Sequence, residues 1–289
     1  MLSRTKLVVV GVAGVFILGL AVSWFLGGLL YAPSKRKSEP LSSDLKAETI
    51  QIHSASGSVL SGWYVPAIQD DAPIVILMHA VRGCREDMVE RAIFLHAAGY
   101  ATLLFDFQAH GDSPGEHITF GYLESRDAQA VVDFARAKNP KAKVGIIGVS
   151  MGGAAALLAN PPLQVDAMVL ESVYPDIERA VENRVVMRLG RAGKIFTPLL
   201  TSQIRLRLGI STDQLRPIDG VAELTVPKYF FAGAEDRHTT LAEANELYAA
   251  AAEPKEFWAV EGMRHVNLHR ASKQEYERRV LDFFSKTLK

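Results

Sequence analysis

Ser150 lies in a short glycine-flanked motif, Gly148–Gly152, of the form G-x-S-x-G. An apolar, β-branched segment precedes it and an alanine-rich segment follows it, so a strand is predicted to turn directly into a helix at the serine. Such a tight turn crowds the serine backbone, and small neighbours relieve the crowding while the hydroxyl points outward. The pattern predicts a nucleophilic Ser150 between the glycines Gly148 and Gly152. The alternative is a serine that only caps the helix.

A serine hydroxyl is a weak nucleophile at neutral pH, and it needs a base that is itself oriented by an acid. His265 and Asp236 directly follow predicted strands, as Ser150 does. The carboxyl ends of parallel strands meet at one edge of a sheet, where ligands bind. We therefore predict a catalytic triad in the chain order Ser150, Asp236, His265. Glu235 and Glu171 also lie at strand ends and stay open as alternative acids.

Acyl transfer through a serine also needs two backbone N–H groups that stabilise the oxyanion of the tetrahedral intermediate. Met151, the residue after the nucleophile, is expected to supply one of them, helped by the N-terminus of its helix. The other is expected from residues 79–83, the loop after an earlier strand, and we assign it to Val81. His79 is predicted to hold this loop rather than to act as a base.

The segments that must position these residues alternate between strand and helix patterns. Short, continuous apolar runs predict buried strands, and longer segments with helical spacing of apolar residues predict helices. The predicted strands are Glu48–His53, Val59–Val65, Ile74–His79, Ala101–Asp106, Val144–Gly148, Ala167–Glu171, Lys228–Ala232 and Glu256–Val260. The predicted helices are Glu86–Ala98, Tyr122–Lys138, Met151–Ala159, Leu241–Ala252 and Glu275–Leu288. This alternation predicts an α/β fold, with a mostly parallel sheet that helices cover on both faces.

The N-terminal segment differs from the rest, because residues 7–34 form a run of 28 positions without a charge. About 20 apolar residues cross the hydrocarbon layer as a helix, so residues 1–34 are predicted to be a transmembrane anchor that contacts the lipid bilayer through residues 7–31. A cleaved signal peptide and a buried helix of a soluble protein are the alternatives. Basic residues flank the run on both sides, so the side of the membrane that holds the domain stays undecided.

After this run, residues 35–46 are predicted to be a polar tether, and residues 47–289 a single domain. The 32 Lys and Arg residues balance 32 Asp and Glu residues, which excludes the charge signature of a nucleic-acid-binding protein. The single cysteine, Cys84, cannot form an internal disulfide, a Cys-based zinc site or an iron–sulfur cluster. No metal or organic cofactor is expected. The oligomeric state stays open.

Five motifs in this order resemble the α/β-hydrolase superfamily, serine-hydrolase branch, over most of the chain. They are His79-Ala80-Val81, Asp106–Ser113, Gly148–Gly152, Gly233–Asp236 and Gly262–His265. With the N-terminal run, the chain is similar to membrane-tethered bacterial hydrolases and to a related eukaryotic membrane-anchored group. The resemblance implies an α/β-hydrolase fold. The chain departs from the family pattern at Ala80 and Ala109, where glycine is usual.

The resemblance also implies a cap inserted at about residues 173–225. Residues 175–217 hold eight Lys or Arg and four Asp or Glu. Val181, Val185 and Leu189 recur every four residues among arginines, which predicts an amphipathic basic helix. Such a cap either packs on the domain with its charges in water, or lies on anionic lipid, or recognises an anionic or acyl-bearing substrate.

These motifs predict a single-pass, membrane-anchored serine hydrolase that cleaves an ester or thioester through an acyl-enzyme. Its expected partners are an acyl ester or thioester substrate and the bilayer, with no nucleic acid. Two alternatives stay open, because a fold alone does not decide a function. One is a non-catalytic binding or scaffold protein that keeps the fold, and the other is a serine peptidase of the same fold.

Overall fold

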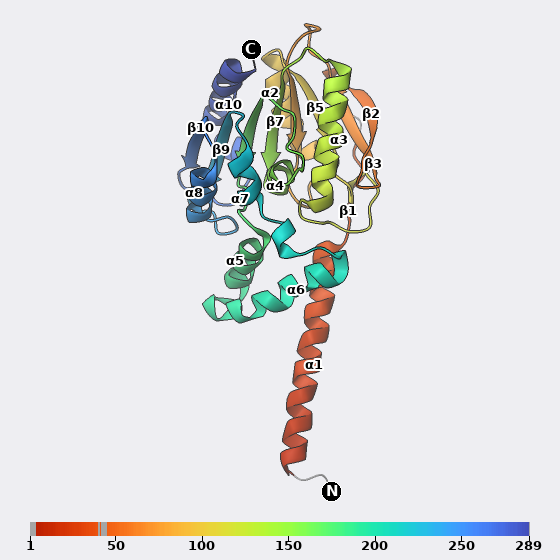
Figure 1. Ribbon diagram of the computed structural model, residues 1–289, viewed down its shortest axis with the longest axis vertical. Helices are drawn as coiled ribbons and strands as arrows, with labels where there is room; N and C mark the ends of the chain where they lie inside the picture. Colours follow the sequence, from red (N-terminus) through yellow and green to blue (C-terminus); the bar gives the residue numbers. More distant parts are fainter. Residues whose placement is uncertain (1–3, 40, 42–44, 289) are drawn as a thin grey trace.

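The computed structural model describes residues 4–39, 41 and 45–288, with the backbone alone described at residues 4–10, 12, 15 and 16. Its centre is an eight-stranded sheet in the order β10-β9-β8-β7-β4-β5-β3-β2 (Figure 1). The strands are β2 (Glu48–His53), β3 (Val59–Val65), β4 (Ile74–Met78), β5 (Ala101–Phe105), β7 (Val144–Val149), β8 (Ala167–Glu171), β9 (Lys228–Gly233) and β10 (Lys255–Val260). β3 runs antiparallel to its neighbours β2 and β5, and the other strand pairs are parallel.

The eight strands predicted from the sequence all lie in this sheet, each within one residue of its predicted bounds. Continuous apolar runs form its centre, where both faces are covered. Every residue of β4 and β5 is buried. The predicted α/β fold with a mostly parallel sheet is confirmed.

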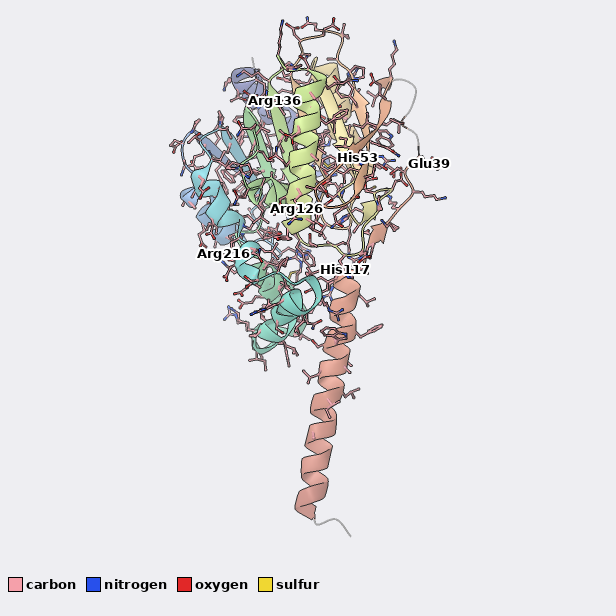
Figure 2. All side chains as sticks on the ribbon, turned by 45° about the vertical axis from the view of Figure 1, so that its right-hand side comes forward. Glu39, His53, His117, Arg126, Arg136 and Arg216 are labelled. Carbon is pink, nitrogen blue, oxygen red and sulfur yellow. The ribbon has the colours of Figure 1, made fainter. Side chains whose placement is uncertain are left out.

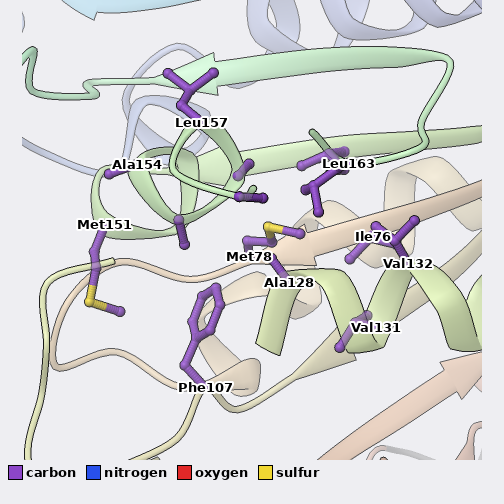
Figure 3. Close-up of a cluster of buried hydrophobic side chains, with 14 of the residues drawn as sticks. Ile76, Met78, Phe107, Ala128, Val131, Val132, Met151, Ala154, Leu157 and Leu163 are labelled. Atoms are coloured by element: carbon purple, nitrogen blue, oxygen red, sulfur yellow. The ribbon is translucent and has the colours of Figure 1, made fainter. Parts of the chain in front are cut away.

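Helices pack on both faces of the sheet. Outside the cap they are η2 (Arg85–Met88), α2 (Val89–Ala97), α3 (Tyr122–Lys138), α4 (Met151–Leu157), α8 (Leu241–Ala250), α9 (Leu268–Ala271) and α10 (Lys273–Thr287). Successive residues of a strand point to opposite faces. Ile76 and Met78 therefore pack with α3 and α4 (Figure 3), whereas Val75 and Leu77 pack with α2 and α10.

The segment between β8 and β9, which the sequence resemblance identifies as a cap, is helical, and we refer to it as the cap. It holds α5 (Ile177–Leu189), η3 (Arg191–Phe196), α6 (Thr197–Leu208), η4 (Thr212–Gln214) and α7 (Pro217–Glu223). The apolar stripe predicted for α5 is only partly correct, because Val185 is buried whereas Leu189 is 60% exposed. Ile195 and Phe196 are also exposed. In Figure 1, α5 and α6 lie beyond the same end of the strands as α1.

The N-terminal helix α1 (Arg4–Tyr31) extends away from the domain (Figures 1 and 2). Within the residues that the structure describes, no helix has the length and apolar character of a membrane span. The transmembrane anchor predicted for residues 1–34 is thus not supported. The lipid contact predicted through residues 7–31 is also not supported. At the end of this run Tyr31 is buried, and the Arg207 guanidinium stacks on the ring of Trp24.

The beginning of the segment predicted as a polar tether lies against the domain. Strand β1 (Ser34–Lys35) pairs in parallel with β6 (His110–Gly111). Arg36 forms ion pairs with Glu86 and Asp87 at 3.0 and 3.2 Å. Residues 40 and 42–44 of the predicted tether lie outside the described residues. The end of α1 is therefore connected to the domain by a paired strand.

Candidate active site

Ser150 occupies a strained turn between β7 and α4. Its backbone has φ +49° and ψ −110°, which is costly for a residue with a side chain. A Cβ atom at Gly152 would lie 2.5 Å from the Met78 carbonyl oxygen, and one at Gly148 would lie 2.6 Å from the Cα atom of Gly153. Both flanking glycines are therefore required by the close approach of the backbone, as the motif predicts.

Gly153 is a third constrained glycine, which lies outside the predicted motif. A Cβ atom there would lie 2.3 Å from Cγ2 of Val173 and 2.9 Å from the Gly148 carbonyl oxygen. The pair Gly152-Gly153 was the only signal for it in the sequence. The first turn of α4 can thus approach the end of β7 closely, which holds Ser150 above the sheet.

Asp236 and His265, both predicted for the triad, lie in contact. The Asp236 Oδ2 atom is 2.6 Å from Nδ1 of His265, and the Asp236 side chain is fully buried. The other carboxylate oxygen, Oδ1, accepts hydrogen bonds from the N–H groups of His238 and Thr239 at 2.7 and 3.0 Å. These partners hold the carboxylate in one orientation toward the imidazole.

The close approach of two loops brings this pair together. The N–H of Glu235 donates to the Met263 carbonyl oxygen at 2.8 Å. A Cβ atom at Gly233 would lie 2.5 Å from that same oxygen and 2.6 Å from the Arg264 carbonyl oxygen. Glycine at 233 is thus needed for the loops after β9 and β10 to meet, a role that the sequence reading did not assign.

Neither of the two alternative acids, Glu171 and Glu235, forms a hydrogen bond with His265 among the described residues. The Glu171 carboxylate is buried and forms an ion pair with Arg91 at 2.8 Å, and it also accepts a hydrogen bond from the Tyr276 hydroxyl. Glu235 is exposed. Of these three carboxylates, Asp236 is the one that contacts the His265 ring.

Ser150 and His265 both follow strands at the carboxyl edge of the sheet. The described residues include no hydrogen bond between the Ser150 hydroxyl and the His265 ring; in unliganded sites such bonds often tighten only when substrate binds. The ring of His238 lies 4.9 Å from that of His265, centroid to centroid, and lines the same cavity as Ser150. Burial, followed by the nearby His265 and Arg184, lowers the pKa of His238. The sequence reading missed this second histidine, although it lies two residues after Asp236.

The loop after β4 is held by His79, as predicted. The His79 Nδ1 atom donates to the Ala80 carbonyl oxygen at 2.7 Å, and Nε2 accepts from the N–H of Phe107 at 3.1 Å. This arrangement requires a neutral ring, and burial lowers the pKa of His79 to about 3. The loop places Val81 in the lining of the cavity that Met151 and Ser150 also line.

Of the two departures from the family pattern, Ala80 lies in this loop and Ala109 lies in the loop between β5 and β6 (His110–Gly111). Ala109 adopts φ +58°, a left-handed conformation that favours glycine. It is buried, and its N–H donates to the Pro114 carbonyl oxygen at 3.0 Å. The Ala80 carbonyl oxygen accepts from the N–H of Gly83 at 3.0 Å. The chain therefore keeps the turn at residue 109 despite its side chain.

A cavity of about 380 Å³ opens beside Ser150. Its lining is mostly apolar and comes from three parts of the chain: the domain, the cap and the end of α1, which contributes Leu30 and Tyr31. The contribution of α1 was not predicted. Among the described residues, no group of three or more His, Cys, Asp or Glu side chains could hold a metal ion.

The family model described as "Serine aminopeptidase, S33" (Hydrolase_4) matches residues 69–216, about half of the chain. The chain belongs to this family. It is therefore a serine hydrolase of the α/β-hydrolase fold, which confirms the predicted class of enzyme.

Several known proteins are similar to the chain. It is 29% identical to an uncharacterized protein of Mycobacterium tuberculosis, Rv2307c, over 82% of this chain and 79% of the other. It is 25% identical to the α/β-hydrolase domain-containing protein WAV2 of Arabidopsis thaliana, over 84% and 81% of the two chains. Among solved structures, the Pyrococcus furiosus esterase Pf2001 is similar with a TM-score of 0.73 and 22% identity, over 89% of this chain and all of the other.

Proposed function

We propose that this serine hydrolase cleaves an ester or thioester through an acyl-enzyme, with Ser150, His265 and Asp236 as its triad. The observation that carries the proposal is the His265–Asp236 pair at the sheet edge where Ser150 occupies its strained turn. A buried carboxylate on Nδ1 leaves the other ring nitrogen, Nε2, as the one that can take a proton from a serine hydroxyl.

The reaction then proceeds in two acyl transfers. Ser150 Oγ attacks the carbonyl carbon while His265 Nε2 takes its proton, and the intermediate collapses when that proton passes to the leaving alcohol or thiol. A water molecule next attacks the acyl carbon while His265 takes its proton. The bond between Ser150 Oγ and the acyl carbon then breaks, His265 returns the proton to Ser150 Oγ, and the carboxylic acid leaves. The N–H groups of Met151 and Val81 are proposed to stabilise the oxyanion in both steps.

The cavity favours an acyl substrate over a small polar one. Its mostly apolar lining can bury a hydrocarbon chain, at about 25 cal/mol per Å² of apolar surface removed from water. Two solved structures with this fold are described as esterases, one from Pyrococcus furiosus and one from Exiguobacterium antarcticum. Ester cleavage is therefore the proposed activity.

Aminopeptidase activity is a second candidate, because the family model carries that description. Comparing p-nitrophenyl esters of increasing chain length with amino-acid p-nitroanilides distinguishes the two. We expect turnover of the esters, with a preference for an acyl chain of medium length. Turnover of the anilides alone would support the peptidase.

A fluorophosphonate probe tests the triad and the non-catalytic alternative together. The full-length protein should be labelled, and Ser150→Ala should abolish the label. Ser113→Ala, at a buried serine outside the proposed triad, is the matched control and should keep it. An unlabelled wild-type protein would favour the scaffold.

We also propose, from the sequence, that the protein associates with a membrane. The proposal rests on the charge-free run of residues 7–34 and on the exposed apolar side chains of α1, such as Ile17 and Phe25. Flotation with native membranes should recover the protein in the lipid fraction. Recovery only in the soluble fraction would reject a membrane location.

A further inference from the structure

The cavity beside Ser150 has an apolar body. Five of the side chains around it are Leu30 of α1, Phe120 of the domain, and Ile177, Val181 and Ile204 of the cap. These residues come from parts of the chain that are far apart in sequence, so the cavity exists only because α1 and the cap close over the sheet edge. A chain of several methylene groups fits such a surface.

The charged residues around this cavity are all basic. Arg82, Arg184 and Arg188 line it, and no Asp or Glu among the described residues does. Arg82 already donates hydrogen bonds to the carbonyl oxygens of Leu29 and Leu30. Arg184 and Arg188, the two arginines of α5 that line the cavity, are therefore the ones available to a ligand.

Arg184 has an unusual environment for a charged side chain. It is half-buried, and its one hydrogen bond among the described residues goes from Nη1 to the Ala180 carbonyl oxygen, at 2.6 Å. It forms no ion pair within the described part of the chain. Burial lowers the pKa of Arg184, because a charged guanidinium that is partly removed from water and has no ion-pair partner is destabilised.

The nearest carboxylates are engaged with other groups. Asp236 contacts His265, and Glu243 accepts hydrogen bonds from Asn183 at 2.8 and 2.9 Å. Arg179, in the same helix, shows the contrast, because it forms ion pairs with Asp176 and Glu246. The structure thus pairs Arg179 with two carboxylates and leaves Arg184 lining the cavity without one among the described residues.

We propose that Arg184 and Arg188 bind an anionic group of the substrate. The substrate is then an amphiphilic ester or thioester that carries both an apolar chain and a carboxylate or a phosphate. A guanidinium suits this task, because its N–H groups match the oxygens of either anion in a bidentate arrangement. The inference rests on the proposed hydrolysis and names its substrate class.

Kinetics with three matched esters test the proposal on the full-length protein. They are p-nitrophenyl octanoate, its analogue with a carboxylate on the nitrophenyl ring, and the mono-p-nitrophenyl ester of octanedioic acid. The last two place the anion on the leaving group and on the acyl chain, so they tell which end Arg184 and Arg188 bind. The quantity to compare is kcat/KM for each anionic ester divided by kcat/KM for the neutral one, because differences in intrinsic reactivity then cancel between variants.

Arg184→Gln with Arg188→Gln should lower this ratio about 10-fold or more for one of the anionic esters, since a hydrogen bond to a charged group contributes about 1.5–3 kcal/mol. Arg191→Gln, the matched control at an exposed arginine outside the cavity, should keep the wild-type ratio. An unchanged ratio in the double variant overturns the proposal.

A binding measurement separates this proposal from the proposed hydrolysis. Octyl phosphate and octanol are titrated into full-length Ser150→Ala protein, with and without the two arginine substitutions. The substitutions should raise the Kd of octyl phosphate about 10-fold or more and change that of octanol much less. Equal changes for both ligands, or no binding of octyl phosphate, reject the anion site even if the esters are cleaved. Selective loss of octyl phosphate binding supports it even if they are not.

Discussion

At the scale of single residues, the orientation of the Asp236 carboxylate is the feature on which the proposed chemistry depends most. One oxygen faces His265 and the other is held by two backbone N–H groups. An amide in place of this carboxylate could place its N–H group opposite Nδ1 of His265, which is itself a donor in the active tautomer. The imidazole would then lose its hydrogen-bond partner, and the tautomer with a free Nε2 lone pair would no longer be favoured.

We therefore expect Asp236→Asn to lower kcat/KM for a p-nitrophenyl ester by about 10³- to 10⁴-fold, the size of loss seen when a triad carboxylate becomes an amide. The fold should persist, as checked by circular dichroism. Glu235→Gln, a matched change at the exposed neighbour, should stay within about threefold, since exposed groups away from the reaction contribute little. Similar losses in both variants would contradict the assignment of Asp236.

His79 gives a prediction about pH and stability. Burial lowers the pKa of His79 to about 3 in the folded protein, whereas a free histidine titrates near 6.5. Between these values the unfolded chain binds the proton and the folded chain does not, so the free energy of unfolding falls as the pH is lowered. His79 should contribute a loss of about 2 kcal/mol between about pH 7.5 and pH 5.

Urea unfolding at both pH values measures this loss. His79→Gln keeps a donor and an acceptor but does not titrate, so its free energy of unfolding should fall less than that of the wild type by the same amount. Comparing the two proteins removes the contributions of all other titrating groups. Parallel pH profiles would show that His79 is not the neutral, buried group described above.

At the scale of elements, α1 belongs partly to the domain. Gln203 of α6 donates a hydrogen bond to the Ser23 carbonyl oxygen at 3.2 Å, and the Tyr31 carbonyl oxygen accepts from the N–H of Ile118 at 2.9 Å. His117, labelled in Figure 2, marks the loop that meets this end of α1. The last turns of the helix therefore serve as a wall of the cavity, whereas the first turns extend away from it.

Two deletions separate these parts. Removal of residues 2–20 leaves every contact named above, so stability and ester preference should not change. Removal of residues 2–33 deletes Leu30 and the buried Tyr31. It should lower the free energy of unfolding by about 2–5 kcal/mol, as for other large losses from a core, and should reduce kcat/KM more for long-chain than for short-chain esters. Urea unfolding and a chain-length series measure both effects, and equal behaviour of the two proteins would show that α1 is only an appendage.

At the scale of the whole molecule, a buried ion pair connects parts that lie far apart in the sequence. Arg91 of α2 donates hydrogen bonds to the Glu171 carboxylate at the end of β8. Arg91 Nε also donates to the Tyr276 hydroxyl of α10, and that hydroxyl donates to the Glu171 carboxylate. The side chains of Arg91 and Glu171 are 2% and 1% exposed. This network lies next to the turn of Ser150, whose N–H donates to the Glu171 carbonyl oxygen at 2.7 Å.

Breaking one side of this pair should destabilise the entire domain. We expect Glu171→Gln or Arg91→Met to lower the free energy of unfolding by about 3–5 kcal/mol, because an uncompensated charge or polar group stays buried. Arg91→Met with Glu171→Leu should recover part of this loss. Denaturant unfolding measures each variant, and Lys286→Met, at an exposed pair on α10, is the control that should change little. A loss no larger than that of the control would mean that water reaches the pair.

The sequence by itself determined the sheet and the order of the proposed site. Continuous apolar runs such as those of β4 and β7 can only be buried, and their period and length define strands without knowledge of their neighbours. Ser150, Asp236 and His265 each follow such a strand, so parallel topology alone brings them to one edge. Local pattern was sufficient because each of these inferences depends on a few adjacent residues.

Only the tertiary structure decided how α1 and the cap close over that edge. A Cβ atom at Gly27 would lie 2.0 Å from Oε1 of Gln203, so a side chain at residue 27 would displace the Gln203 amide that contacts α1. In the sequence, Gly27 belongs to a charge-free run that reads as a membrane segment, and Arg184 belongs to a basic helix that could face water. Which surfaces meet depends on the packing of side chains that lie more than a hundred positions apart in the sequence. Composition and periodicity describe neighbouring residues, so they do not specify such contacts.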